Sequence, residues 1–344
     1  MANKEAKRTD GIDVVAIMTP PGSHQAIAET FINKNINIIS DKPFAGNLNQ
    51  AKSLFKKIKS NKNIVIGTYQ SLIKKSVEYF EQFDAVIVDE THKAKSASIK
   101  TILQKCTKAQ YRYGLSGTIP KDGTLDKLTL MSQTGPVISE VKASFLQDQG
   151  HIAKCVVKVI EMNYATDSQR LAFQELAQNK YDSKDVFQLE QNFIINSEGR
   201  LDFISSVIAR VPRNSLVLFH RIEHGKRLYE KLRQESNKRV YYVDGGTDKD
   251  IREEYKKKME AGEEVVIVAS YGTFSTGISI KKIHNIFFTE SFKSEVIIRQ
   301  SIGRGLRQHE SKDKVLIVDF VDDIRTDEWD NYLFKHGKAR QSIY

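Results

Sequence analysis

Cysteine is scarce in this sequence, and no apolar stretch is long. The 344 residues include two cysteines, Cys106 and Cys155, too few for a disulfide framework or a cysteine-rich zinc site. The eight histidines fall in different predicted elements, so we expect no structural metal. No apolar run could cross a bilayer, and the charged N-terminus lacks the apolar core of a secretory signal. These absences predict a protein that stays in the cytoplasm.

Acidic residues are fewer than basic ones. Lys and Arg number 53 and Asp and Glu 43, which gives a formal net charge of +10. A positive excess attracts phosphate backbones and supplies the salt-dependent part of nucleic-acid binding. Since many basic proteins bind no nucleic acid, the charge favours a polyanionic partner without establishing one.

Short β-branched segments alternate with helical ones along most of the chain. This pattern is typical of an α/β protein with parallel sheets covered by helices, and the length suits two domains. Residues 165–208 have few strand signals and many helix formers, so they predict a helical connector. The apolar strands are expected to be buried on both faces. They cover residues 14–18, 36–40, 64–67, 85–88, 216–219, 240–243, 265–269, 285–289 and 315–320.

A strand that ends in two carboxylates and an imidazole is the first candidate for chemistry. Residues 83–88 are mostly apolar, and Asp89, Glu90 and His92 follow. Carboxylates at the end of a parallel strand lie where open sheets bind ligands. Asp89 could hold Mg²⁺, Glu90 could deprotonate a water that attacks a γ-phosphate, and His92 could report the nucleotide state. Taken alone, a solvated loop after a core strand is the more frequent explanation.

Two further strands end in small hydroxyl residues. The first, at residues 113–115, leads to Ser116, Gly117 and Thr118, which could relay the state of the carboxylate site or form only a turn. The second, at residues 265–269, leads into a loop rich in hydroxyls and glycine, whose amides could grip phosphates. A plain strand-loop junction explains the second segment about as well.

The last segment, Ile298–Arg307, is predicted to lie at the start of a helix. Arg304 and Arg307 are three residues apart, so both would point to one face and reach a phosphate chain together. Gly303 would leave room for close approach. A salt-bridged surface helix would explain the two arginines equally well.

Taken in order, these four segments resemble motifs II, III, V and VI of superfamily 2 helicases, with motif II of the DExH kind. Residues 216–224 resemble motif IV, and residues 64–72 resemble the nucleic-acid-contacting motif of the first motor domain. Within the superfamily, residues 269–279 and 300–307 are most similar to UvsW-type phage helicases. The resemblance runs from about residue 61 to the C-terminus.

This resemblance implies two RecA-like domains. Residues 61–165 would be a partial first domain, residues 166–208 the helical connector and residues 209–344 the second domain. The family's activity would be ATP-driven unwinding of branched DNA or RNA–DNA hybrids in replication, recombination and repair. ATP and Mg²⁺ would be the cofactors, DNA and possibly RNA the partners, and the bacterial host cytoplasm the location of a phage-encoded protein.

The resemblance also implies a role for each site residue. The acidic pair would face the arginine pair across an inter-domain gap that holds ATP. Asp89 would hold Mg²⁺, Glu90 would be the catalytic base, and His92, Arg304 and Arg307 would complete the catalytic set. Nucleotide-binding residues would be Gln300, Gly277 and Gly303; coupling residues Ser116, Gly117 and Thr118; and nucleic-acid-binding residues Thr68, Gln70, Ser270 and Tyr271.

A helicase of this kind needs a phosphate-holding loop, Gly-x-x-x-x-Gly-Lys-[Ser/Thr], before motif II. No Gly-Lys-Ser or Gly-Lys-Thr occurs in the 344 residues. In its place, residues 11–60 resemble the middle of the nicotinamide domain of Gfo/Idh/MocA oxidoreductases. The resemblance lies in a Thr-Pro-Pro turn at residues 19–21 and in Lys42, which follows Asp41. The Gly-x-Gly-x-x-Gly loop of that family is absent too.

Residues 1–60 are therefore interpreted as a Rossmann-like βαβ fragment, joined to the helicase segment between about residues 51 and 63. The join is either a natural fusion or a chimera made in sequence assembly. Two alternatives to an active helicase stay open: a catalytically inactive nucleic-acid-binding remnant and, with less support, a fragment of an NAD-dependent oxidoreductase.

Amplification of the locus from source DNA tests the origin of the join. An uninterrupted helicase gene with its own phosphate loop would show that the join is artificial. A product that carries residues 1–60 and the helicase segment in one reading frame would show a natural fusion.

Overall fold

The chain divides into two units, residues 1–137 and residues 138–344. In the computed structural model, the described residues are 14–17, 26–30, 37–40, 53, 65 and 67–344, the last range with short gaps. The gaps are residues 94–95, 121, 165–170, 172–173, 176–177, 179–182, 276–279, 292–293 and 326–329. Each unit is described by itself. No helix in these ranges is long and apolar enough to span a membrane.

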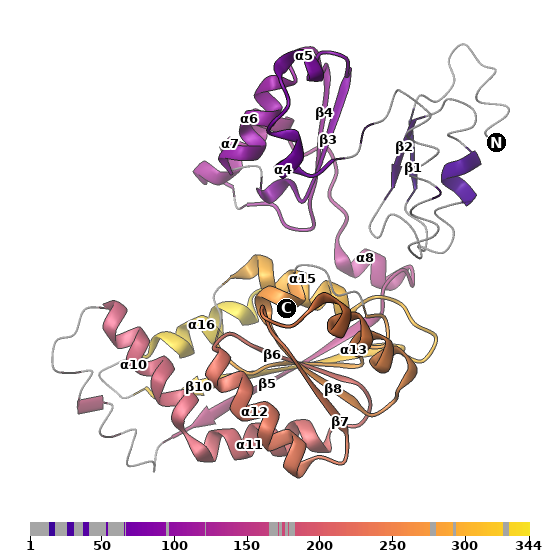
Figure 1. The fold of residues 1–344 in the computed structure, drawn as a ribbon. Coiled ribbons are helices and arrows are strands. Elements are labelled where there is room, and N and C mark those ends of the chain that lie inside the picture. Colours follow the sequence, from indigo (N-terminus) through magenta and orange to yellow (C-terminus); the bar gives the residue numbers. More distant parts are fainter. Residues whose placement is uncertain are drawn as a thin grey trace. The chain divides into compact units, whose positions relative to one another are not determined.

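The first unit contains two separate pairs of parallel strands (Figure 1). Strand β1 (Val14–Ile17) pairs with β2 (Asn37–Ser40), and β3 (Ala85–Asp89) pairs with β4 (Tyr111–Leu115). Parallel neighbours need a crossover, and α6 (Ala97–Lys105) lies between β3 and β4 in the sequence. The predicted strands at residues 14–18, 36–40 and 85–88 are thereby confirmed. Val65 and Gly67, in the segment predicted as strand 64–67, lie outside any strand.

One face of the β3–β4 pair is covered and the other is bare. Val86 and Val88 pack against α6 and α7 (Leu125–Thr134), through Leu103 and Leu130 among others. On the opposite face Ile87 is 42% exposed and its partner Tyr113 40% exposed. The expected burial of both faces is therefore wrong for these strands. The unit also contains α4 (Tyr69–Leu72), η1 (Thr91–Lys93) and α5 (Val77–Phe80).

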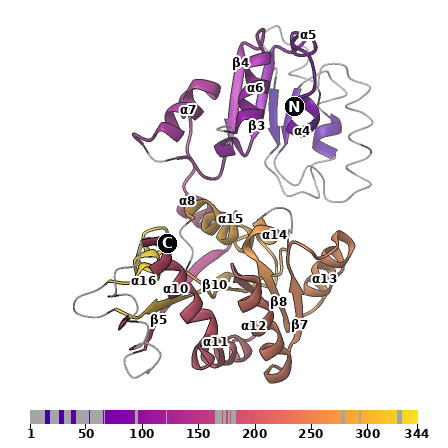
Figure 2. The ribbon, with the colours of Figure 1, turned by 60° about the vertical axis from the view of Figure 1, so that its left-hand side comes forward.

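The second unit is built on a six-stranded parallel sheet with the order β5-β10-β9-β6-β8-β7. The strands are β5 (Lys154–Asn163), β6 (Ser215–Phe219), β7 (Arg239–Val243), β8 (Val265–Ser270), β9 (Asn285–Phe288) and β10 (Lys314–Asp323). Helices α11 (Glu198–Arg210) and α12 (Ile222–Glu235) pack on one face, while α13 (Lys249–Ala261) and α15 (Glu295–Gly305) pack on the other (Figures 1 and 2). This layering confirms the α/β class, and all five strands predicted in this region are present. The remaining helices are α8 (Ala143–Asp148), α10 (Ser183–Asn196), α14 (Tyr271–Ser275) and α16 (Tyr332–Gln341).

Strand β5 lies in the second unit, although the sequence analysis placed residues 138–165 in the first RecA-like domain. It pairs with β10 over ten residues, from Lys154 opposite Lys314 to Asn163 opposite Asp323. A strand of that length has its hydrogen-bonding groups satisfied where a long parallel neighbour is available. Helix α11 likewise packs Leu201, Ile204 and Ile208 into the core, so this part of the expected connector is integral to the second unit.

Two helical glycines offer a matched test of this packing. A Cβ at Gly225 in α12 would lie 2.6 Å from the ring of Phe219, whereas a Cβ at Gly199 in α11 would meet nothing within 4 Å. Gly225→Ala should therefore destabilise the protein by about 1–3 kcal/mol through overpacking. Gly199→Ala should stabilise it by up to about 1 kcal/mol through helix propensity. Urea unfolding measures both, and equal effects would contradict the described packing.

Candidate functional site

The acidic pair stands at a strained turn directly after β3. Glu90 has a φ of 51°, in the left-handed region, and its N–H donates a hydrogen bond of 2.8 Å to Oδ1 of Asp89. Such a backbone costs an L-residue on the order of 1 kcal/mol, and strain of this kind gathers at functional sites. The turn keeps the exposed Asp89 and the half-buried Glu90 together at the carboxyl end of the strand.

His92 connects the acidic pair to the residues after β4. Its Nδ1 lies 2.9 Å from Oγ of Ser116 and 3.4 Å from Oε2 of Glu90. Ser116 donates its hydroxyl proton to the carbonyl oxygen of Thr118 at 2.6 Å, and the Thr118 N–H donates to Oγ of Ser116 at 3.1 Å. Because the Ser116 proton is used, Nδ1 of His92 must be the donor in its bond to Ser116. The segment after β3 and the segment after β4 are thus in direct contact through His92 and Ser116.

Glycine makes this contact possible at one position. A Cβ at Gly114 in β4 would lie 2.8 Å from the side chain of Thr91, so only glycine lets the turn after β3 approach β4 so closely. Gly117, which the sequence analysis grouped with Ser116, has open space where its Cβ would stand. The hydroxyl oxygen of Thr118 is buried and has no hydrogen-bond partner among the described residues. A polar ligand at this edge would supply one.

The predicted nucleic-acid contacts of the first unit lie at a helix start. Thr68 precedes α4 as its N-cap residue, and its Oγ1 lies 2.7 Å from Oγ of Ser71. Thr68 and Gln70 are both exposed, so their side chains are accessible to a large ligand.

In the second unit, the segment after β8 differs from the prediction. Ser270 bonds to Oγ1 of Thr273 at 2.8 Å and remains partly accessible. Tyr271, in contrast, is 3% exposed and its ring stacks on Phe288 at a centroid distance of 6.1 Å. The ring of Tyr271 therefore packs in the core of the second unit, and its contact with nucleic acid stays a prediction. Gly277 lies outside the described residues.

The arginine pair lies at the end of a helix, not at its start as predicted. Ser294 caps α15, Arg304 is in the last turn, and Arg307 follows the helix end at Gly305. Arg307 therefore lies outside the helix that carries Arg304. A Cβ at Gly303 would meet nothing within 4 Å, which agrees with the open approach expected there, and Gln300 is half-buried in the same helix.

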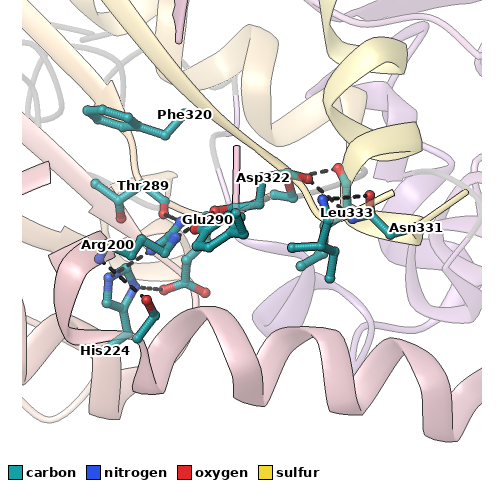
Figure 3. Close-up of polar contacts among 12 residues, drawn as sticks. Arg200, His224, Thr289, Glu290, Phe320, Asp322, Asn331 and Leu333 are labelled. Atoms are coloured by element: carbon teal, nitrogen blue, oxygen red, sulfur yellow. Dashed lines mark hydrogen bonds and ion pairs between the residues drawn. The ribbon is translucent and has the colours of Figure 1, made fainter. Parts of the chain in front are cut away.

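A buried ionic cluster at the carboxyl edge of the large sheet was not predicted (Figure 3). Arg200 of α11 donates to both carboxylate oxygens of Asp322 in β10, at 2.7 and 3.0 Å, and to the carbonyl of Thr289 at 2.6 Å. His224 of α12 lies 2.8 Å from Glu290, which follows β9, and 3.4 Å from Arg200. All four charged or titratable side chains are buried. Residues from four elements are thus tied together at one edge.

Glu290 also accepts backbone donors at the start of α12. The N–H groups of His220 and Arg221 lie 3.1 and 3.2 Å from its carboxylate. Burial alone would raise the pKa of Glu290, but the hydrogen bond to His224 and these backbone bonds outweigh it and lower the pKa. A carboxylate held at a helix N-terminus is further stabilised by the helix dipole. The cluster therefore fixes the segment that was predicted as motif IV.

Comparison with known proteins identifies two regions of the chain. Residues 199–309 match the family of helicase conserved C-terminal domains, and residues 2–69 match the oxidoreductase family with an NAD-binding Rossmann fold. Both resemblances stated from the sequence are thereby confirmed. The oxidoreductase match extends somewhat beyond the expected residues 11–60 and includes Thr68.

The relatives that match most of this chain are helicases. The chain is 31% identical to the ATP-dependent DNA helicase UvsW of Enterobacteria phage T4 over 301 residues, which are 84% of this chain and 58% of that helicase. It is 25% identical to a putative ATP-dependent RNA helicase of Acanthamoeba polyphaga mimivirus, over 81% of this chain and 50% of that protein. The chain thus spans about half the length of the curated relatives it matches.

Solved structures support the fold. A DNA-bound ATP-dependent type ISP restriction-modification enzyme, LlaBIII, matches with a TM-score of 0.57 and 17% identity, over 99% of this chain and 27% of that one. The crystal structure of T4 UvsW matches with a TM-score of 0.45 and 27% identity, over 100% of this chain and 68% of that one. The α/β class with parallel sheets is shared with the first of these.

The buried cluster predicts a large loss of stability when one partner is removed. Arg200→Met would leave the buried carboxylate of Asp322 without its cation, with only the hydroxyl of Tyr164 still donating to it at 2.7 Å, and should lower the free energy of unfolding by about 3–5 kcal/mol. Arg233, whose ion pair with Glu230 is exposed, provides the control. Arg233→Met should change stability by no more than about 0.5 kcal/mol. Similar denaturation midpoints for the two variants would contradict this account.

Proposed function

Because residues 199–309 belong to the helicase C-terminal domain family, we propose that the chain is part of an ATP-dependent helicase or translocase that acts on DNA. The observation that carries this proposal is a chain of contacts: Glu90 lies 3.4 Å from His92, and hydrogen bonds then link His92 to Ser116 and Ser116 to Thr118. In a motor, hydrolysis at the nucleotide must change the conformation of the segments that contact nucleic acid. Contacts from the carboxylate of Glu90 to the segment after β4 could transmit such a change.

Glu90 is assigned the role of the base that orients and deprotonates the attacking water. It is half-buried at the carboxyl edge of β3, beside His92. A change in the charge or position of its carboxylate would alter the interaction with His92, and so the hydrogen bond to Ser116. The residues after β4 would then respond to the state of the nucleotide.

Asp89 is assigned as the residue that would hold Mg²⁺. Within the ranges that the structure describes, no group of three or more His, Cys, Asp or Glu side chains could hold a metal ion alone. Mg²⁺ usually binds one or two carboxylates together with substrate phosphates and water, so the exposed carboxylate of Asp89 fits a nucleotide-borne ion. When bound, Mg²⁺ neutralises charge on the phosphates. The partnerless hydroxyl of Thr118 also fits a polar ligand nearby.

Arg304 and Arg307 are assigned the stabilisation of charge on the phosphates, with Gln300 and Gly303 near the nucleotide. This role requires that the second unit approach the acidic pair of the first. Thr68, Gln70 and Ser270 are proposed to contact nucleic acid, which the net charge of +10 would attract. Branched DNA and RNA–DNA hybrids are the proposed substrates.

A second candidate function is passive binding of nucleic acid. The absence of a Gly-Lys-Ser or Gly-Lys-Thr sequence favours it, because the backbone amides and the lysine of that loop hold the phosphates of ATP in such motors. A passive protein would bind strands in a salt-dependent way without turnover.

Nucleic-acid-stimulated ATP hydrolysis distinguishes the two functions. Glu90→Gln should lower the stimulated kcat by roughly 10²- to 10⁴-fold, since the amide cannot accept a proton, while DNA binding is retained. Glu78, an exposed acidic residue of α5, provides the control, and Glu78→Gln should leave kcat unchanged.

The opposite result is equally clear. If the unaltered protein shows no hydrolysis with either DNA or RNA, yet binds DNA with an affinity that falls with salt and ignores ATP, the motor proposal is rejected. The passive function then stands.

A further inference from the structure

The residues around Arg307 are held by several hydrogen bonds to main-chain groups. We call residues 304–308 the arginine segment, since Arg304 and Arg307 lie within it. It spans the end of α15 and the turn that leads toward β10. Three separate contacts hold its backbone and its last side chain.

The first contact comes from a buried ammonium group. Lys312 is 5% exposed, and its Nζ donates to the carbonyl oxygen of Gly305 at 2.6 Å and to that of Ile283 at 2.9 Å. Gly305 lies between the two arginines, and Ile283 precedes β9. Burial, helped by the nearby Arg307 and opposed by Glu260, lowers the pKa of Lys312 to about 8. Placing an ammonium group there is costly, so its two carbonyl partners must be well fixed.

The other contacts come from the chain that enters the second unit. Helix α8 ends at Asp148, and Gly150 follows its C-cap with a φ of 68°, a conformation that favours glycine. The carbonyl of Gly150 accepts a hydrogen bond of 2.6 Å from Nε2 of Gln308, and the N–H of Ala153 donates to the carbonyl of Leu306 at 2.8 Å. Residues 150–153 therefore bind the arginine segment directly before β5 begins.

Packing leaves the segment little freedom. A Cβ at Gly305 would lie 2.5 Å from Cδ1 of Ile286 in β9, so this glycine lets the helix end lie directly on the sheet. Leu306 and Ala153 are buried in the same core cluster. The hydrogen bonds and the packing define one position for the backbone that carries both arginines.

We propose that Lys312 is a positioning residue for Arg304 and Arg307, and that residues 150–153 couple the arginine segment to the connection from the first unit. The role of the arginines rests on the proposed function, whereas the hold on the segment does not. A guanidinium displaced by about 1 Å can cost a reaction roughly 10²-fold, so a rigid support for the arginines has a direct effect on turnover.

Lys312→Met is the informative change, because it keeps most of the aliphatic length and removes the donors. Lys314, exposed at the start of β10 two residues after Lys312, gives the matched control Lys314→Met. Lys312→Met should lower the nucleic-acid-stimulated kcat roughly 10- to 100-fold with little change in KM for ATP. In a protein that already carries Arg304→Ala, Lys312→Met should add almost nothing, because the two residues act through one step. Independent, multiplicative losses would overturn the proposal.

Hydrogen exchange tests the same hold without any activity. Amides of residues 305–308 and 153 should exchange faster in Lys312→Met than in Lys314→Met, while amides of the central strands β6 and β8 stay protected. Unchanged exchange at residues 305–308, or a uniform loss of protection across the sheet, would show that Lys312 has no local positioning role. If the unaltered protein hydrolyses no ATP, the proposed function fails and this measurement still decides the hold on the segment.

Discussion

The buried ion pair between Arg200 and Asp322 connects helix α11 to the end of strand β10. Its guanidinium also reaches the carbonyl of Thr289, and His224 links it to Glu290. A buried charge is stable only with well-placed partners, so α11, α12 and the ends of β9 and β10 cannot shift independently. The carboxyl edge of the sheet is consequently rigid, and the loops that leave it start from fixed positions.

The opposite edge of the same sheet is stabilised by a different chemistry. There Lys312 donates to main-chain carbonyls, and Asn214 donates to the carbonyls of Met259, Gly262 and Lys282 while its own oxygen accepts from Val265. Ion pairs fix one edge and amide or ammonium donors fix the other, around an apolar interior. Both edges of the sheet in the second unit are therefore fixed by buried polar groups as well as by the apolar core.

Much of the fold could be predicted from local sequence, because parallel strands buried on both faces are continuous apolar runs. Strand β5 was missed because charged residues interrupt it at Lys158 and Glu161, and because its partner β10 is distant in sequence. The proximity of His92 to Ser116 was predictable, because the two motifs follow strands β3 and β4, which are parallel neighbours. Arg200 gave no signal, since an arginine in an amphipathic helix ordinarily faces solvent. The burial of Tyr271 was missed because the segment was expected to be a loop, whereas Tyr271 begins helix α14 and packs into the core.

The bare face of the β3–β4 pair has a consequence for handling the protein. Ile87, Tyr111, Tyr113 and Leu115 form a contiguous apolar strip on strands of equal register. An exposed apolar strip of this kind favours self-association. The tendency of the protein to aggregate is therefore expected to rise with its concentration, with this strip of the first unit as a point of contact.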